Sequence, residues 1–220
     1  MNENHFIDES VARLRSHFGR KLLVFPPFTT ETLHRIVELV GRVPDDLMVF
    51  LRSHNGLRID IEGREDTALW GTQEMMAHAI DPASSIVPRC FLPIRGDPTG
   101  ERDWLITEFD PAFGAIVRWN PWTPAIRLMA SSLGSYLSGW VDFLTACYGP
   151  DGKALSSRPH STFNASWIKN DPCIAKLRHD PVVAEWLGKV AEAATCNEPG
   201  CREGKEYVLC GPMCRKQTVS

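Results

Sequence analysis

The order of helical and strand-like segments is the feature that most limits the possible folds of this 220-residue chain. Apart from one strand-like run at residues 21–25, helical periodicity dominates up to residue 56. Short strand-like runs dominate residues 57–130, and helical periodicity returns at residues 133–149. A parallel sheet would instead need strands and helices to alternate. We therefore predict an α+β fold, with a mixed, largely antiparallel sheet and helices packed around it.

Apolar spacing, capping residues and turn residues place the individual elements. Helices are expected over residues 8–18, 29–41, 44–56, 72–80, 133–149 and 181–194. Strands are expected over residues 21–25, 57–63, 67–71, 90–94, 103–110, 114–120 and 124–130. Gly, Pro and Ser are frequent just after residue 149. We therefore divide the chain into an α+β domain at 1–149, a linker or surface segment at 150–180, and a helix with a Cys-rich tail at 181–220.

Composition excludes several function classes. The net charge is −3, the pI is about 6.2, and no block of Lys and Arg occurs, so we expect no direct nucleic-acid binding. The longest apolar runs are far shorter than the ~20 residues of a membrane-spanning helix. The polar N-terminal sequence has no apolar signal region. We expect a soluble cytoplasmic protein without a membrane partner; the oligomeric state stays open.

The charge-dense stretch between the apolar runs near residues 91 and 106 matches no phosphate or catalytic loop. Each Gly-Lys pair in the chain is followed by Ala, Val or Glu, whereas a P-loop needs Ser or Thr there. The alternating residues Asp97, Thr99, Glu101 and Asp103 resemble a calcium loop, but Pro98 interrupts them and no Glu occupies the closing position. The G-x-G-x-x-G, H-E-x-x-H and G-x-S-x-G motifs are absent. We predict no catalytic residue and no enzymatic activity.

Several single residues have ordinary structural interpretations. His54 is expected to be a cationic group at a helix C-terminus rather than a base or ligand. Tryptophans 104, 119, 122 and 140 are expected in the core or at its rim. Three scattered cysteines are expected to be small buried apolar residues: Cys90, Cys147 and Cys173.

Four segments in a fixed order resemble the SUKH superfamily of bacterial immunity proteins and fungal Smi/Knr-type regulators. The resemblance covers roughly residues 30 to 148, with Val43 in a position where Leu is usual. Its matching positions are Val43-Pro44-Asp45-Asp46-Leu47, Phe50-Leu51, Asn55-Gly56, Leu92-Pro93-Ile94, Gly96-Asp97, Trp104-Leu105-Ile106, Val117 with Trp119, and Tyr136 to Leu144.

The resemblance implies a binding scaffold without shared catalytic machinery, in which the loop after residue 94 is a hairpin bend. We expect Gly96 and Gly100 to adopt backbone angles closed to other residues there. The immunity branch neutralises toxins that are often nucleases or other nucleic-acid-modifying enzymes. Two groups of acidic residues are candidates for contact with the basic cleft of such a toxin: Asp60, Glu62, Glu65 and Asp66, and Asp97, Glu101 and Asp103.

The C-terminal cysteines have the spacing C-x4-C-x8-C-x3-C, at Cys196, Cys201, Cys210 and Cys214. Four neighbouring thiolates suit one tetrahedral structural Zn²⁺ and leave no open position for water. The piece from Cys201 to Cys210 resembles the SEC-C zinc motif through Gly204, Lys205 and Tyr207, but the outer spacings differ. The alternative is a tail with four free thiols.

Three functions follow in order of support. The leading hypothesis is an immunity protein that binds a cognate protein toxin in the cytoplasm. The second is a Smi/Knr-type regulatory adaptor or a zinc-tail protein-interaction module, which would bind several partners weakly. The third is a hydrolase that uses the metal of the tail, and no sequence feature favours it.

Overall fold

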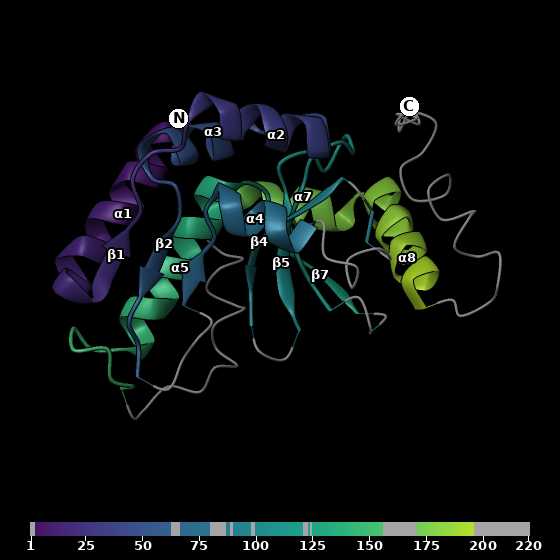
Figure 1. The fold of residues 1–220 in the computed structure, drawn as a ribbon. Coiled ribbons are helices and arrows are strands. Elements are labelled where there is room, and N and C mark those ends of the chain that lie inside the picture. The colour runs from purple at the N-terminus through teal and green to yellow at the C-terminus, as the bar shows by residue number, and fades with distance from the viewer. Residues whose placement is uncertain are drawn as a thin grey trace.

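The computed structural model describes residues 3–62, 67–79, 87–88, 90–97, 100–120, 123, 125–155 and 171–195 (Figure 1). It contains a three-stranded sheet in the order β1-β2-β3 and a four-stranded sheet in the order β4-β5-β6-β7. The strands are β1 (Leu22–Val24), β2 (Leu57–Ile59), β3 (Ala68–Leu69), β4 (Phe91–Gly96), β5 (Arg102–Ile106), β6 (Ile116–Trp119) and β7 (Ile126–Ala130). The predicted α+β class is confirmed. All strand pairs within these two sheets are antiparallel, so "mixed" was wrong for the described residues.

Seven α-helices surround the sheets within the described residues. They are α1 (Glu3–Phe18), α2 (Thr30–Val40), α3 (Asp45–Ser53), α4 (Thr72–Ala79), α5 (Leu133–Cys147), α7 (Pro172–His179) and α8 (Pro181–Thr195). A short 3-10 turn, η1 (Gly19–Lys21), links α1 to β1. Figure 1 places α1 and α8 at opposite ends of the molecule, with the strands between them. No helix in these ranges is long and apolar enough to cross a membrane.

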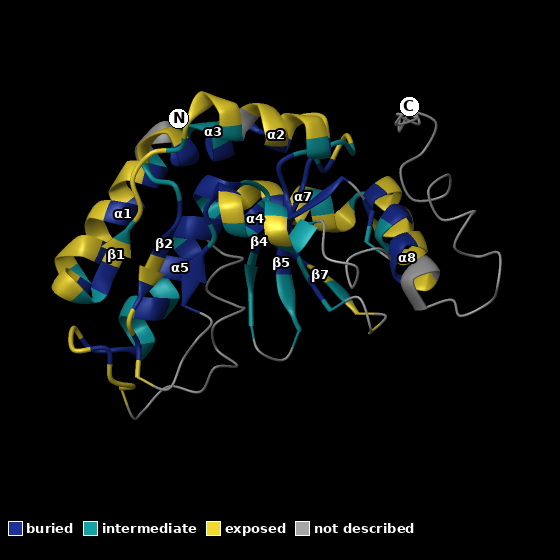
Figure 2. Ribbon diagram, in the orientation of Figure 1, coloured by how far each residue is buried: buried dark blue, intermediate teal, exposed yellow. Residues whose placement is uncertain are grey.

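The larger core lies between one face of both sheets and the helices α1, α2, α3 and α5. Strand residues such as Leu57, Leu92 and Leu105 meet Leu14 of α1 and Trp140 of α5 there, all at most 1% exposed. The two sheets join where the backbone N–H of Trp70 donates to the carbonyl of Ile94 at 2.9 Å. Figure 2 shows the buried residues on the strands and on the inward sides of the helices.

A second core covers the opposite face of the four-stranded sheet. Trp104 and Trp119, predicted to lie in the core, pack there, and Trp186 of α8 joins them. Trp140 is buried in the first core as predicted, while Trp122 lies outside the described residues. The four-stranded sheet is therefore covered on both faces, which explains the continuous apolar character of its strands.

Helix α7 falls inside the segment predicted to be a linker. Asp171 is its N-cap and accepts hydrogen bonds from the backbone N–H groups of Cys173 and Ile174, both at 3.1 Å. The same carboxylate also accepts from the N–H and hydroxyl of Ser131, which ties α7 to the end of β7. Ile174 is fully buried in the second core. The helices after residue 171 thus pack onto the sheet itself.

The two glycines of the β4–β5 hairpin have different roles. Gly100 has a φ of 86°, as expected for a turn glycine. Gly96 has no positive φ, so the predicted role for its backbone was wrong. A Cβ at Gly96 would instead lie 2.8 Å from the ring of Trp70, which is closer than real Cβ contacts allow. Gly96 is therefore needed because an indole lies directly against its backbone.

Candidate functional site

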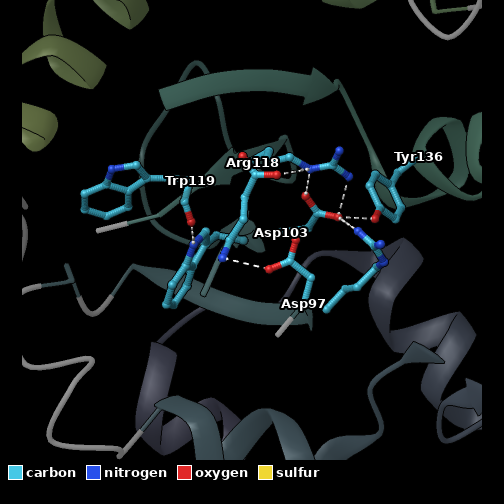
Figure 3. Close-up of polar contacts among 8 residues, drawn as sticks. Asp97, Asp103, Arg118, Trp119 and Tyr136 are labelled. Carbon is cyan, nitrogen blue, oxygen red and sulfur yellow. Dashed lines mark hydrogen bonds and ion pairs between the residues drawn. The ribbon is translucent and has the colours of Figure 1, made fainter. Parts of the chain in front are cut away.

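A buried ionic cluster forms the most strongly perturbed polar site in the described residues. Strand register places Arg95 of β4, Asp103 of β5 and Arg118 of β6 in one row across the sheet. Arg95 donates to Asp103 Oδ2 at 2.8 Å. Arg118 donates through Nε to Oδ1 at 2.7 Å and through an Nη to Oδ2 at 3.0 Å (Figure 3). The three strands are thus joined by side chains as well as by backbone hydrogen bonds.

Tyr136 of α5 completes the cluster by donating its hydroxyl to Asp103 Oδ2. Helix α5 is held in place at its N-terminus, where Asp46 Oδ2 accepts from the N–H of Leu133 at 2.6 Å. Asp46 belongs to the Pro-Asp-Asp-Leu piece at the start of α3. Its carboxylate therefore connects α3 to α5 and fixes the height at which Tyr136 meets the sheet.

The electrostatics keep Asp103 ionised. Burial alone would raise its pKa, but the charges of Arg118 and Arg95, with hydrogen bonds from Arg118 and Tyr136, outweigh burial and lower the pKa from 3.8 to about 2. The pKa of Tyr136 is raised by burial and by the adjacent Asp103 charge, so its hydroxyl keeps its proton. The cluster is therefore a carboxylate held between two guanidiniums and one neutral phenol.

This geometry fits a structural role for Asp103 better than a role in proton transfer. Asp103 is 0% exposed, and its two oxygens together accept four hydrogen bonds. Arg95 and Arg118 close the cluster toward solvent, with side chains 11% and 15% exposed. A general base needs an accessible acceptor and a pKa near neutrality. Asp103 has neither, so the cluster acts as a polar clamp between the sheet and α5.

The predicted interface role of Asp103 is therefore corrected. The sequence shows a carboxylate near a turn, but the residue belongs to a strand whose inner face is covered by α5. Its neighbours in the predicted group are also engaged locally. Asp97 Oδ1 accepts from the N–H of Glu101 at 3.0 Å across the hairpin, and Glu101 lies 3.9 Å from Arg118. The arginines of the two strands offset the charge of this acidic group.

The other predicted group lies at the end of β2. Asp60 is exposed and pairs with Lys21 at 2.5 Å. The backbone N–H of Glu62 donates to the carbonyl of Gly152 at 3.2 Å, and its side chain is exposed. Glu65 and Asp66 lie outside the described residues. Asp60 and Glu62 thus have the exposure that contact with a partner requires.

His54 is mostly buried at the C-cap of α3 and lies 3.9 Å from Asp8. Burial, with the nearby positive charge of Arg15, lowers its pKa despite the opposing effect of Asp8. A histidine with a lowered pKa is largely neutral at neutral pH, so the expected cationic interaction at the helix end is not supported.

The cysteines divide into described and undescribed groups. Cys90 is buried as expected, Cys147 is half-buried, and Cys173 is exposed, which corrects its predicted burial. Cys196, Cys201, Cys210 and Cys214 lie outside the described residues, so the zinc prediction stays a prediction. In the described ranges no three His, Cys, Asp or Glu side chains gather as metal ligands.

Sequence reasoning did not find Arg95, Arg118 or Tyr136. A usable signal was present, since Arg95 and Arg118 each interrupt an otherwise apolar strand. A charged residue inside such a strand indicates either a solvent-facing position or a buried ion pair. Only the position of α5 decides between these two possibilities. This helix lies far along the sequence and covers the face of the sheet that carries the two arginines.

A shallow apolar groove of about 260 Å³ lies between β7, α7 and α8. Leu128, Leu177 and Leu187 are among its lining residues. Arg178 forms part of its wall and donates to the carbonyl of Leu128 at 2.7 Å. The groove holds no cluster of acid, base and nucleophile that would suggest a reaction.

No protein-family model matches the sequence, and no curated protein shows significant similarity to it.

Proposed function

We propose that this chain is a SUKH-like immunity protein that binds and neutralises a cognate protein toxin in the cytoplasm without catalysing a reaction. The toxin class we propose is a nuclease or another nucleic-acid-modifying enzyme. The exposed carboxylates of this chain, Asp60 and Glu62, would then lie at the rim of the interface and face part of the toxin's basic substrate cleft.

The observation that carries the proposal is the environment of Asp103. An enzyme keeps its strongly perturbed titratable group open to substrate, because that group must exchange a proton or form a bond. Here the carboxylate is fully buried and saturated by donors from β4, β6 and α5. Such a clamp stiffens a scaffold, which suits a protein that binds with little rearrangement.

The arrangement of the sequence pieces also supports the proposal. The segments that resemble the SUKH superfamily form α3, the β4–β5 hairpin, β6 and α5. Asp46 and Asp103 join these four elements through buried hydrogen bonds. The resemblance therefore follows one connected structural unit, and the proposed zinc tail would be an addition to it.

The test is an affinity capture from the source cells with the tagged full-length protein as bait. The expected result is one toxin-like protein retained in a 1:1 ratio, as quantified by mass spectrometry of the eluate. Several housekeeping proteins at substoichiometric amounts would instead support a regulatory adaptor. The non-enzymatic proposal would be overturned if the chain alone turned over a substrate and lost this activity when metal was removed.

A further inference from the structure

Two large apolar side chains that are exposed lie on the same short strand region. Leu23 is 53% exposed and Phe25 is 37% exposed. They are two residues apart along β1 and its extension, so they point to the same face of the three-stranded sheet. The backbone of Phe25 still pairs with this sheet, since its N–H donates to the carbonyl of Gly56 at 3.1 Å.

An arginine lies in the same patch. Strand register pairs Leu23 with Arg58 and Arg58 with Ala68, so these three side chains share the outer face of the sheet. The opposite, inner face carries Leu57 and Ile59 in the larger core. We call the surface formed by Leu23, Phe25 and Arg58 the outer-sheet patch.

Arg58 is an exposed cation without an ion-pair or hydrogen-bond partner in the part of the chain that the structure describes. This differs from the next row of the same face, where Lys21 and Asp60 neutralise each other at 2.5 Å. The guanidinium of Arg58 can donate hydrogen bonds to a partner, and covering the apolar side chains beside it would remove apolar surface from water, which favours binding. Arginine and aromatic residues are enriched at the centre of protein interfaces, and the patch contains one of each.

We propose that the outer-sheet patch is the surface on which this chain holds its protein partner, and that the partner presents a carboxylate beside an apolar side chain. The carboxylate pairs with Arg58, and the apolar side chain covers Leu23 and Phe25. The Lys21–Asp60 pair lies at the rim, where polar residues of an interface remain hydrated. This inference rests on the proposed function, because it names the docking surface of the same partner.

The test compares baits that differ only at exposed positions. Leu23→Ser and Arg58→Glu alter the patch. Val182→Ser and Arg35→Glu are matched controls, since Val182 is 57% exposed on α8 and Arg35 is exposed on α2. All four are surface changes, so thermal unfolding of each variant should match that of the wild type. The readout is the Kd of each full-length variant for the purified protein captured by the wild-type bait.

The expected result is at least a tenfold increase in Kd for both patch variants and less than a twofold change for both controls. A Lys at the partner's contacting Asp or Glu should restore binding to Arg58→Glu, because the two charges are exchanged. If all variants bound the partner equally well, the proposed docking role of the outer-sheet patch would be wrong, while the proposed function would still stand. A wild-type bait that retains no stoichiometric partner would overturn the proposed function and the patch with it.

Discussion

Replacement of Asp103 by Asn should destabilise the protein strongly and change how its stability depends on pH. The variant keeps the side-chain volume but removes the buried negative charge that Arg95 and Arg118 share. Removing one member of a buried ion pair costs about 3–5 kcal/mol at neutral pH. We expect this loss in the free energy of unfolding at pH 7, measured by urea denaturation with Trp fluorescence.

The pH dependence follows from the lowered pKa of Asp103. A fall from 3.8 to about 2 corresponds to roughly 2 kcal/mol of stability from ionisation, on the scale of about 1.4 kcal/mol for each pKa unit. This contribution is fully present above about pH 5 and is lost as the pH falls through about 2, where the folded carboxyl takes up its proton. The wild type and the variant should therefore become more similar in stability over that range.

The matched control is Asp110→Asn, which removes a carboxylate that is 74% exposed and 3.4 Å from Arg42. Exposed pairs contribute roughly 0.2–1 kcal/mol, so the control should remain close to the wild type. The clamp interpretation would be refuted if Asp103→Asn lost less than about 1 kcal/mol, or if its stability fell with acid in parallel with the wild type.

Three further changes test other parts of the account. Gly96→Ala forces a Cβ to 2.8 Å from the Trp70 ring and should cost about 1–3 kcal/mol of unfolding free energy. Gly188→Ala, whose Cβ meets nothing within 4 Å, should instead stabilise α8 by about 0.5–1 kcal/mol in the same urea titration. Asp46→Ala removes the acceptor for the first N–H groups of α5 and should cost about 1–3 kcal/mol, whereas an unchanged midpoint would show that the cap is dispensable. Substituting Ser for the four tail cysteines should reduce bound zinc, measured by elemental analysis, from one ion per chain to none; zinc-free wild-type protein would contradict the tail prediction.

The parts of the fold that were predictable from sequence are those with strong periodicity or strong turn residues. The apolar stripe over residues 29–41 predicts α2, and the structure places this helix at Thr30–Val40, with Thr29 as its N-cap and Gly41 as its C-cap. Helix α7 was missed because its eight residues carry little apolar periodicity, although Asp171 followed by Pro172 is a helix-start signal. The N-cap residue Asp171 also accepts a hydrogen bond from Ser131. Ser131 is 40 positions away, so a local sequence pattern cannot reveal this contact.

The polar site was harder to predict because it depends on long-range packing. Asp103 reads as a turn residue, and only its contacts with Arg118 and Tyr136, 15 and 33 positions away, make it a buried clamp. The alternation of β2 predicts Arg58 as an ordinary outward-facing strand residue, as it is. That no charged group among the described residues pairs with it depends on the tertiary structure. Sequence identifies the residue types, whereas the tertiary structure decides which charges meet.

We propose that this chain neutralises a partner by binding it. The most direct measurement is the toxic activity of the captured partner, titrated with the purified full-length chain. Inhibition should be complete at one chain per partner molecule, and the Arg58→Glu variant should need a large excess to reach the same inhibition. A partner that is harmless alone, or whose activity is unchanged by a saturating amount of the chain, would contradict the account.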